Sequence, residues 1–294
     1  MGTRAQGRCR GSHSRLSREP PVSIAVNPLT VSQPTEAPPA PAPEQTHPLA
    51  LEPASCCLCG NGDVEPLAVG EDFEDATTRD SFLIVRCRQC GMVYLDPVPS
   101  PEEHARLNAG GPSTAPLRVI PRAGARSVEI RGPIEGIAPP AVPYELIVLK
   151  HALERAVSPR QLLCGAAAML APTGRMVVVT YNAGSTQAAV FSGRHWSGYA
   201  FPRHRQLFTP ETFQVLARTS GLQVVSLRTG AFPAGWARSM RNLLADWRLP
   251  RYLRHGLPVA LPLFVGIEAI ARLRGRGGLF VATLRRSPSR PGAA

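Results

Sequence analysis

Four cysteines are spaced as two matching pairs that could hold one metal ion. Two C-x-x-C-G motifs begin at Cys56 and Cys87, and residues 60–86 lie between the pairs. Four thiolates at this spacing can reach one tetrahedral ion, and in a reducing compartment they favour zinc. Gly60 and Gly91 follow the pairs and, without a Cβ, let backbone N–H groups turn toward sulfur. The predicted ligands of this closed, structural site are Cys56, Cys59, Cys87 and Cys90.

Two other interpretations of the cysteines stay open at this point, namely disulfide bonds and unliganded thiols. Residues 60–86 exceed the roughly 15–20 residues that usually separate two such pairs, although a hairpin in the insert would accommodate them. Cys57 fits the pattern only by shortening the first pair, so we expect it to be a bystander. Cys9 and Cys164 lie outside the pattern.

A second group of residues with acid–base chemistry lies in the C-terminal half. Residues 144–159 read YELIVLKHALERAVSP, which predicts a buried strand followed by the start of a helix. His151 follows that strand, where α/β enzymes hold their ligands, and His204 lies in a later loop rich in His, Trp and Arg. Histidine can accept a proton near neutral pH. Both residues are therefore candidate bases, and a structural role with a ring nitrogen bonded to the backbone is the alternative for each.

Three further residues near these histidines have two interpretations each. Trp196 and Tyr199 could line an acceptor pocket, but we expect them to anchor the loop as buried aromatic side chains. Asn182, at the end of a strand, could cap the next turn or contact a ligand.

Strands and helices alternate over the C-terminal half, which predicts an α/β fold. Continuous apolar strands that alternate with helices indicate a sheet covered on both faces. Thr209 is the predicted N-cap of a helix with Pro210 at its first position and Gly221 beyond its end. We expect strands at 117–120, 127–130, 145–149, 175–181, 222–230 and 277–286. We expect the other helices at about 159–170 and over 236–272.

Composition and charge exclude several classes of protein. The net charge is +12, but Lys150 is the only lysine, which indicates a bias toward arginine rather than a phosphate-binding patch. No run alternates basic and aromatic residues, so we do not expect a nucleic-acid partner. The N-terminus lacks a signal-peptide pattern, and we expect a cytoplasmic protein. The apolar run from Gly256 to Ala271 is shorter than the roughly 20 residues that span a bilayer, so we expect a buried or partly interfacial helix.

The order of these features resembles the class I S-adenosylmethionine-dependent methyltransferases that carry an N-terminal zinc ribbon. The ribbon ends in MVYLDPVPSPEE, and YELIVLKHALERAVSP, LAPTGRMVVVTYN and HW…PRHRQLFTPETF follow it. In that family the fourth strand starts with an acidic residue and leads into a histidine, two residues and Glu-His. Glu145, His151 and Glu154 match this pattern, and Arg155 replaces the second histidine. The resemblance covers residues 56–101 and 144–285, and implies S-adenosylmethionine as cofactor.

The same resemblance implies parts that this sequence lacks. The family holds its cofactor at a glycine-rich turn after the first strand, and an acidic residue after the second strand contacts the ribose. About 30 residues are needed for each β-α-β unit, but only residues 102–143 are available and no strand is followed by G-x-G-x-G. We therefore expect the first strand and its turn to be lost. The segment at 127–130 would keep the place of the third strand, and 117–120 would be a remnant of the second.

Few residues remain as candidates for the cofactor contact. Glu129 and Glu135 could replace the missing ribose acceptor, with His151 beside them, although solvated charges on a loop are the alternative. An arginine-rich surround would also repel the positively charged sulfonium. The cofactor site therefore looks degenerate.

The expected architecture is an incomplete Rossmann-like methyltransferase sheet preceded by a small zinc ribbon and a disordered tail. The predicted segments are a disordered tail (1–54), the zinc ribbon (55–101), a truncated front half (102–143), the C-terminal half of the methyltransferase fold (144–286) and a disordered end (287–294).

The expected function is S-adenosylmethionine-dependent methyl transfer to a small metabolite, such as a sugar or a natural-product intermediate. The alternatives are a catalytically dead pseudoenzyme or a zinc-ribbon module that binds another protein. Loss of a strand leaves sheet edges that need cover, so we expect a homodimer or a partner that supplies the missing half of the fold. No membrane span is expected.

Overall fold

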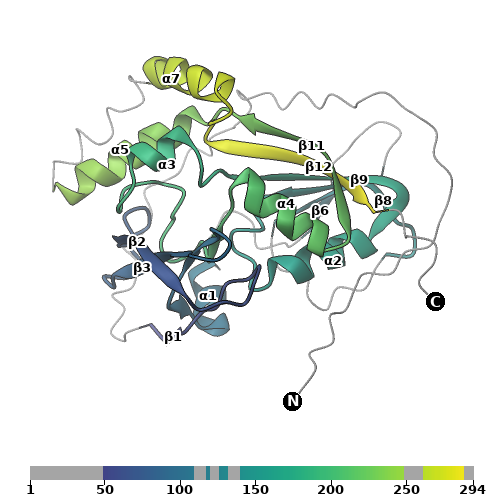
Figure 1. Cartoon of the computed structure of the whole chain (residues 1–294), viewed down its shortest axis with the longest axis horizontal. Helices are drawn as coiled ribbons and strands as arrows, with labels where there is room; N and C mark the ends of the chain where they lie inside the picture. The colour runs from purple at the N-terminus through teal and green to yellow at the C-terminus, as the bar shows by residue number, and fades with distance from the viewer. Residues whose placement is uncertain (1–48, 109–116, 120–125, 132–139, 248–260, 288–294) are drawn as a thin grey trace.

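The fold combines a large mixed sheet, a smaller antiparallel sheet and helices packed around them. The computed structural model describes residues 49–108, 117–119, 126–131, 140–247 and 261–287 of the 294-residue chain. Figure 1 shows the large sheet on one side of the molecule and the small sheet on the other, below helix α5 (Pro233–Asp246). The predicted α/β architecture is therefore confirmed.

The large sheet has six strands in the order β11-β12-β9-β8-β7-β6. Strands β7, β8 and β9 run parallel, and the other neighbouring pairs are antiparallel. The strands are β6 (Leu117–Val119), β7 (Ser127–Ile130), β8 (Tyr144–Lys150), β9 (Leu170–Tyr181), β11 (Leu222–Gly230) and β12 (Leu279–Arg286). Each predicted strand is present, some with shifted ends.

The place of β7 corrects the expectation for residues 127–130. In a doubly wound sheet of order 3-2-1-4-5-6 the first strand lies beside the fourth. Here β7 pairs in parallel with β8, with Val128 opposite Ile147 and Ile130 opposite Leu149. The segment thus occupies the place of the first strand, not the third. Pairing with β7 satisfies the backbone groups along an edge of β8 that would otherwise be left open.

Two helices pack side by side against the large sheet. Helix α2 (Pro159–Ala168) starts after Ser158, whose side chain accepts a hydrogen bond from the Gln161 N–H. Helix α4 (Pro210–Thr219) has the predicted Thr209 cap and Pro210 start, and Gly221 follows it with a φ of +74°. These local signals confirm the predicted helix starts.

A third group of helices lies near one end of the sheet (Figure 1). It consists of α3 (Thr186–Val190), α5 and α7 (Leu261–Leu273). The single helical segment expected over 236–272 is thus two helices that pack against each other, and residues 248–260 lie outside the described part. In the part of the chain that the structure describes, no helix is both long enough and apolar enough to cross a membrane.

The small sheet joins the N-terminal ribbon to the C-terminal half. Its order is β10-β4-β3-β2, and the short strand β10 (Gln206–Leu207) pairs with β4 (Val93–Leu95). Strands β2 (Val64–Gly70) and β3 (Phe82–Cys87) form the hairpin predicted for the insert. The ribbon therefore shares a sheet with residues more than a hundred positions further along the chain.

The end of the predicted disordered tail is ordered, which corrects its boundary. Strand β1 (Leu51–Glu52) pairs with β5 (Val98–Pro99), just before helix α1 (Pro101–Asn108). Leu49 is buried in a core cluster. The pairing of β1 with β5 and the burial of Leu49 hold residues 49–54 in place. The rest of the predicted tail lies outside the described residues.

Candidate functional site

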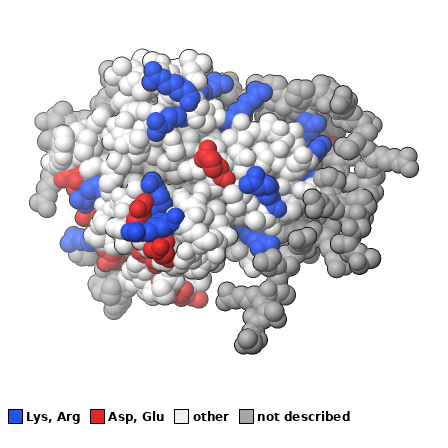
Figure 2. Space-filling view, in the orientation of Figure 1, with Lys and Arg blue, Asp and Glu red and all other residues white. Residues whose placement is uncertain are grey.

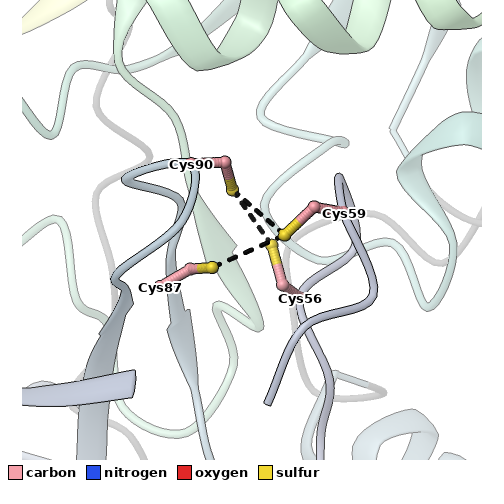
Figure 3. A group of neighbouring side chains, drawn as sticks. All are labelled: Cys56, Cys59, Cys87 and Cys90. Carbon is pink, nitrogen blue, oxygen red and sulfur yellow. Dashed lines mark hydrogen bonds between the residues drawn. The ribbon is translucent and has the colours of Figure 1, made fainter. Parts of the chain in front are cut away.

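The four predicted metal ligands converge from two loops (Figure 3). Their sulfur atoms all lie within 4.8 Å of one another. The Sγ–Sγ distance is 3.3 Å between Cys56 and Cys90, 3.5 Å between Cys59 and Cys87, and 3.6 Å between Cys59 and Cys90. A tetrahedral zinc with Zn–S bonds of about 2.3 Å needs sulfur separations of about 3.8 Å. The size and chemistry of the cluster therefore fit one zinc ion.

Glycine conformation shapes both loops. Gly60 and Gly91 have φ values of +72° and +74°, and their N–H groups donate to the carbonyls of Cys56 and Cys87 at 2.8 and 2.9 Å. A Cβ added at either glycine would meet no atom within 4 Å. Glycine is thus required by the left-handed backbone and not by crowding around the position.

The loop environment affects the thiols differently: burial raises the pKa of the predicted ligands Cys56 and Cys90, whereas the pKa of Cys87 is lowered. Burial opposes ionisation of Cys87, but the backbone N–H groups of Cys90 and Gln89 prevail and lower the pKa of the thiol to about 7. Burial, with the nearby Cys56, raises the pKa of Cys57 to about 12. A thiolate is therefore accessible near neutral pH at Cys87, whereas Cys57 stays a thiol outside the cluster.

The metal cluster is connected to the main hydrophobic core. Cys56 and Cys87 belong to the same cluster of buried residues as Ile147 of β8 and Val178 of β9. Met92, fully buried between the second cysteine pair and β4, belongs to it as well. Order in the ribbon is therefore coupled to order in the large sheet.

A histidine and a carboxylate form a pair at the carboxyl end of β8. The Nδ1 atom of His151 lies 3.1 Å from Oε1 of Glu154, and the histidine ring packs against Tyr181 with 4.9 Å between ring centres. His151 has a φ of +53°, which is uncommon for a residue with a side chain. The left-handed backbone at His151 thus occurs where its side chain is held between the Glu154 carboxylate and the Tyr181 ring.

Glu154 is wholly buried, yet it remains ionised at neutral pH. Burial alone would raise its pKa, but the hydrogen bond and the charge of His151 are the largest of the interactions that lower the pKa to about 2. Its Oε1 also accepts a hydrogen bond from the Tyr181 N–H at 3.4 Å, while Oε2 is buried without a hydrogen-bond partner among the described residues. A buried carboxylate that orients a histidine is the arrangement used to hold a general base in one tautomer.

His204 differs from His151 in its surroundings. Its side chain is buried, and its Nδ1 lies 2.8 Å from the Gly198 carbonyl oxygen. Burial, followed by the charge of Arg155, lowers its pKa to about 3. A neutral ring with a fixed hydrogen bond to the backbone suits the structural role that was the alternative for His204. Its ring centre lies 5.2 Å from that of Tyr181, the residue that also packs against His151.

Trp196, Tyr199 and Asn182, for which two interpretations were open, have the surroundings of residues that stabilise the fold. Trp196 and Tyr199 are buried and pack edge to face, with ring centres 5.1 Å apart. Asn182 accepts a hydrogen bond from the Gly184 N–H at 2.9 Å and donates to the Gly277 carbonyl at 2.9 Å. The aromatic pair therefore anchors its loop, and Asn182 caps the turn after β9.

The predicted ribose acceptors do not form a visible cofactor site. Glu129 is nearly buried, and its carboxylate is engaged by the Arg131 side chain at 2.9 and 3.1 Å. Glu135 lies outside the described residues. No G-x-G-x-G follows β7 in the sequence, and β6 occupies the far side of β7. On β7 the described residues thus offer no free carboxylate to a cofactor ribose, and residues 132–139, which follow the strand, lie outside the described part of the chain.

Two contacts in the structure have little or no signal in the sequence. The pairing of His151 with Glu154 carries only a weak signal, a spacing of three residues directly after a strand. Arg203 pairs with Asp72 of the ribbon hairpin at 3.1 Å, with both side chains nearly buried. No local signal connects residues so far apart in the chain.

Comparison with known proteins identifies the family. A family model described as a methyltransferase domain matches residues 59–227, which is more than half of the chain and includes part of the ribbon. No curated protein matches the sequence.

The similarity to solved structures is distant. The chain is similar to the mitomycin 7-O-methyltransferase MmcR, with 13% identity, a TM-score of 0.30 and coverage of 50% of this chain and 31% of that chain. It is also similar to the O-methyltransferase of a trans-AT PKS multienzyme from Brevibacillus brevis, solved with S-adenosyl-L-homocysteine, with 13% identity, a TM-score of 0.29 and coverage of 50% and 45%. The chain thus spans about a third to a half of the length of these proteins.

Proposed function

The chain belongs to the class I S-adenosylmethionine-dependent methyltransferase family. Within that family, we propose that it is a degenerate member with little affinity for the cofactor. The observation that supports this proposal is the strand beside β7: β6 precedes it in the chain and runs antiparallel to it, where a doubly wound sheet has a parallel second strand. Strand β7 takes the place of the first strand, but no G-x-G-x-G follows it in the sequence, and no parallel second strand with an acidic end lies beside it among the described residues.

Charge around the carboxyl end of β7 lowers the affinity for the cofactor further. Arg131 follows β7 and engages Glu129, the one described carboxylate on that strand. A ribose hydroxyl would have to compete with a two-bond Arg–carboxylate pair, and the sulfonium would lie near a cation. Both effects lower cofactor affinity.

We further propose that the four-cysteine cluster holds a structural zinc ion. The donors Cys56, Cys59, Cys87 and Cys90 offer the sulfur separations of a tetrahedral site, and their thiolates would close its coordination shell. The ion would fold the ribbon loops onto the core that contains β8 and β9. It would supply no Lewis acid for a reaction.

A second function, methyl transfer to a small metabolite, is favoured by the His151–Glu154 pair. The buried carboxylate fixes one ring nitrogen of His151, and the side chain keeps 27% of its surface exposed. Such a histidine could accept the proton of a hydroxyl acceptor. This function requires a rebuilt cofactor pocket or a partner that supplies the missing strands.

Calorimetric titration of the zinc-loaded full chain with S-adenosylhomocysteine separates the two functions. We expect no heat and no thermal stabilisation at millimolar ligand, from a sample whose circular dichroism shows a folded protein. Micromolar binding would overturn the degenerate assignment. In that case Glu129→Gln should weaken binding if Glu129 contacts the ribose, whereas Glu65→Gln on the ribbon strand β2 should not.

A further inference from the structure

Helix α7 buries its one acidic residue and exposes its apolar side chains. Glu268 is fully buried, and Phe264 and Ala271 on the same side are nearly so. Every exposed position from Leu261 to Ile270 is apolar. Exposure reaches 64% for Leu263, 54% for Ile270 and 88% for Leu273 at the end of the helix. This is the reverse of the usual surface helix, which turns polar side chains to water.

Four hydrogen bonds fix this orientation. The Glu268 carboxylate accepts from the Trp236 Nε1–H at 2.7 Å, from the Phe232 N–H at 3.0 Å, from the Gln187 side-chain amide at 3.0 Å and from the Gly278 N–H. The Phe264 ring also stacks on Trp236. Rolling the helix to bury its apolar face would break these four hydrogen bonds and leave the buried donors without an acceptor. The outward apolar face is therefore a stable property of the fold.

Positive charge borders this face. Arg272 and Arg274 follow at the C-terminal end of α7, and both are exposed. The helix carries no exposed acidic residue. In Figure 2 the region of α7, at the top of the molecule, is covered by uncharged atoms and by blue basic side chains, and the red acidic atoms lie lower down. An apolar surface with a basic border matches an anionic lipid surface in both respects.

We propose that α7 docks on an anionic phospholipid membrane, lying along its surface. The 13 residues of α7 are too few to span a bilayer, so the helix would lie in the interface. Leu263, Val265 and Ile270 would enter the acyl boundary while Arg272 and Arg274 contact headgroup phosphates. A second copy fits this surface less well, because a two-fold contact of α7 with itself would give Arg272 and Arg274 no acidic partner on a helix that has no exposed acidic residue.

Flotation of the full chain with lipid vesicles tests the proposal. The probes are vesicles of phosphatidylcholine alone and vesicles in which part of that lipid is replaced by phosphatidylglycerol. We expect at least tenfold more protein to float with the anionic vesicles, and a residual part of the binding to survive high salt because of apolar contact.

Substitutions identify the surface that binds. The double variant Leu263→Asn with Ile270→Asn removes apolar contact without changing the net charge, so we expect binding to fall at least tenfold. Val215→Asn, at an exposed apolar position of α4, is the matched control and should bind like the parent protein. Circular dichroism and thermal melting of each variant verify that the fold is intact.

Two results would overturn the proposal. One is absence of flotation with anionic vesicles, or flotation that high salt abolishes and the asparagine variant leaves unchanged, because charge elsewhere would then explain the binding. The other is a dimer in solution that Leu263→Asn with Ile270→Asn converts to a monomer, together with no vesicle binding. That result would assign the face to a second copy of the chain.

Discussion

The Nδ1 atom of His151 lies 3.1 Å from Oε1 of Glu154, a carboxylate that is fully buried at the carboxyl end of the parallel strands. The folded protein lowers the pKa of Glu154 to about 2, below the value of about 4.3 in an unfolded chain. The ionised carboxylate therefore stabilises the fold fully above pH ~4.3. That stabilisation is lost as the pH falls from ~4.3 through ~2.

Glu154→Gln should remove this dependence on pH. The lowered pKa corresponds to about 3 kcal/mol, so we expect the variant to lose roughly that much unfolding free energy at neutral pH and to show a flatter decline below pH ~4. Urea unfolding at a series of pH values measures both effects. Glu102→Gln on the exposed side of α1 is the control and should retain the parent profile. An equally steep acid decline in Glu154→Gln would contradict the role of this carboxylate.

Buried His204 predicts a second, distinct effect of pH on stability. Its pKa is lowered to about 3 by burial and the nearby Arg155, whereas in an unfolded chain the value is about 6.5. Between these values the unfolded state binds the proton and the folded state does not. Stability is therefore complete above pH ~6.5 and falls as the pH drops, by about 1.4 kcal/mol per pH unit for this residue.

Replacing His204 should reduce that slope between pH ~4 and ~6. His204→Asn removes the titrating ring, and we expect its unfolding free energy, measured by urea, to change less steeply over this range even where the variant is less stable overall. Tyr199→Phe alters the same loop without removing a group that titrates there, so it should keep the parent slope. Equal slopes for the parent protein and His204→Asn would show that His204 is accessible to protons in the folded state.

The cysteine cluster predicts one zinc ion per chain. Elemental analysis of protein purified without chelator should find this stoichiometry, and Cys87→Ser should abolish it. Because Cys87 lies in the core shared with β8 and β9, loss of the ion should lower the unfolding free energy by several kcal/mol. Cys57→Ser is the matched control, one position from a ligand, and should keep both zinc and stability. Zinc loss on replacing Cys57 would mean a different ligand set.

Local signals explain the parts that the sequence predicted well. The cap at Thr209, the proline after it and the glycine at 221 together define α4, and the two C-x-x-C-G motifs define the four-cysteine cluster. Each of these features depends on residues a few positions apart. Backbone conformation at such short range follows from residue type, so the sequence alone is sufficient.

Contacts between distant segments explain the rest. Residues 127–130 were recognised as a strand, but which strand they pair with depends on the open edge of β8, not on their own sequence. The two residues of β10 are too few to carry a strand pattern, yet by pairing with β4 they join the C-terminal half of the chain to the ribbon in the small sheet. The His151–Glu154 pair likewise depends on the left-handed turn at His151. Neither strand pairing is encoded within a short window, and the left-handed backbone at His151 is not marked by a glycine.

The buried carboxylate of Glu268 predicts that α7 is held by hydrogen bonds more than by apolar packing. Glu268→Gln replaces one acceptor oxygen by an NH2 group that would face N–H donors such as that of Trp236, so we expect a loss of about 3–5 kcal/mol in unfolding free energy. Glu211→Gln, at an exposed position in the first turn of α4, should change stability by less than about 0.5 kcal/mol. Hydrogen exchange adds a local readout, because the backbone N–H groups of Phe232 and Gly278 should lose protection in Glu268→Gln. If these two amides stay protected and stability is unchanged, apolar contacts such as the stacking of Phe264 on Trp236 hold the helix, and its orientation does not depend on the carboxylate.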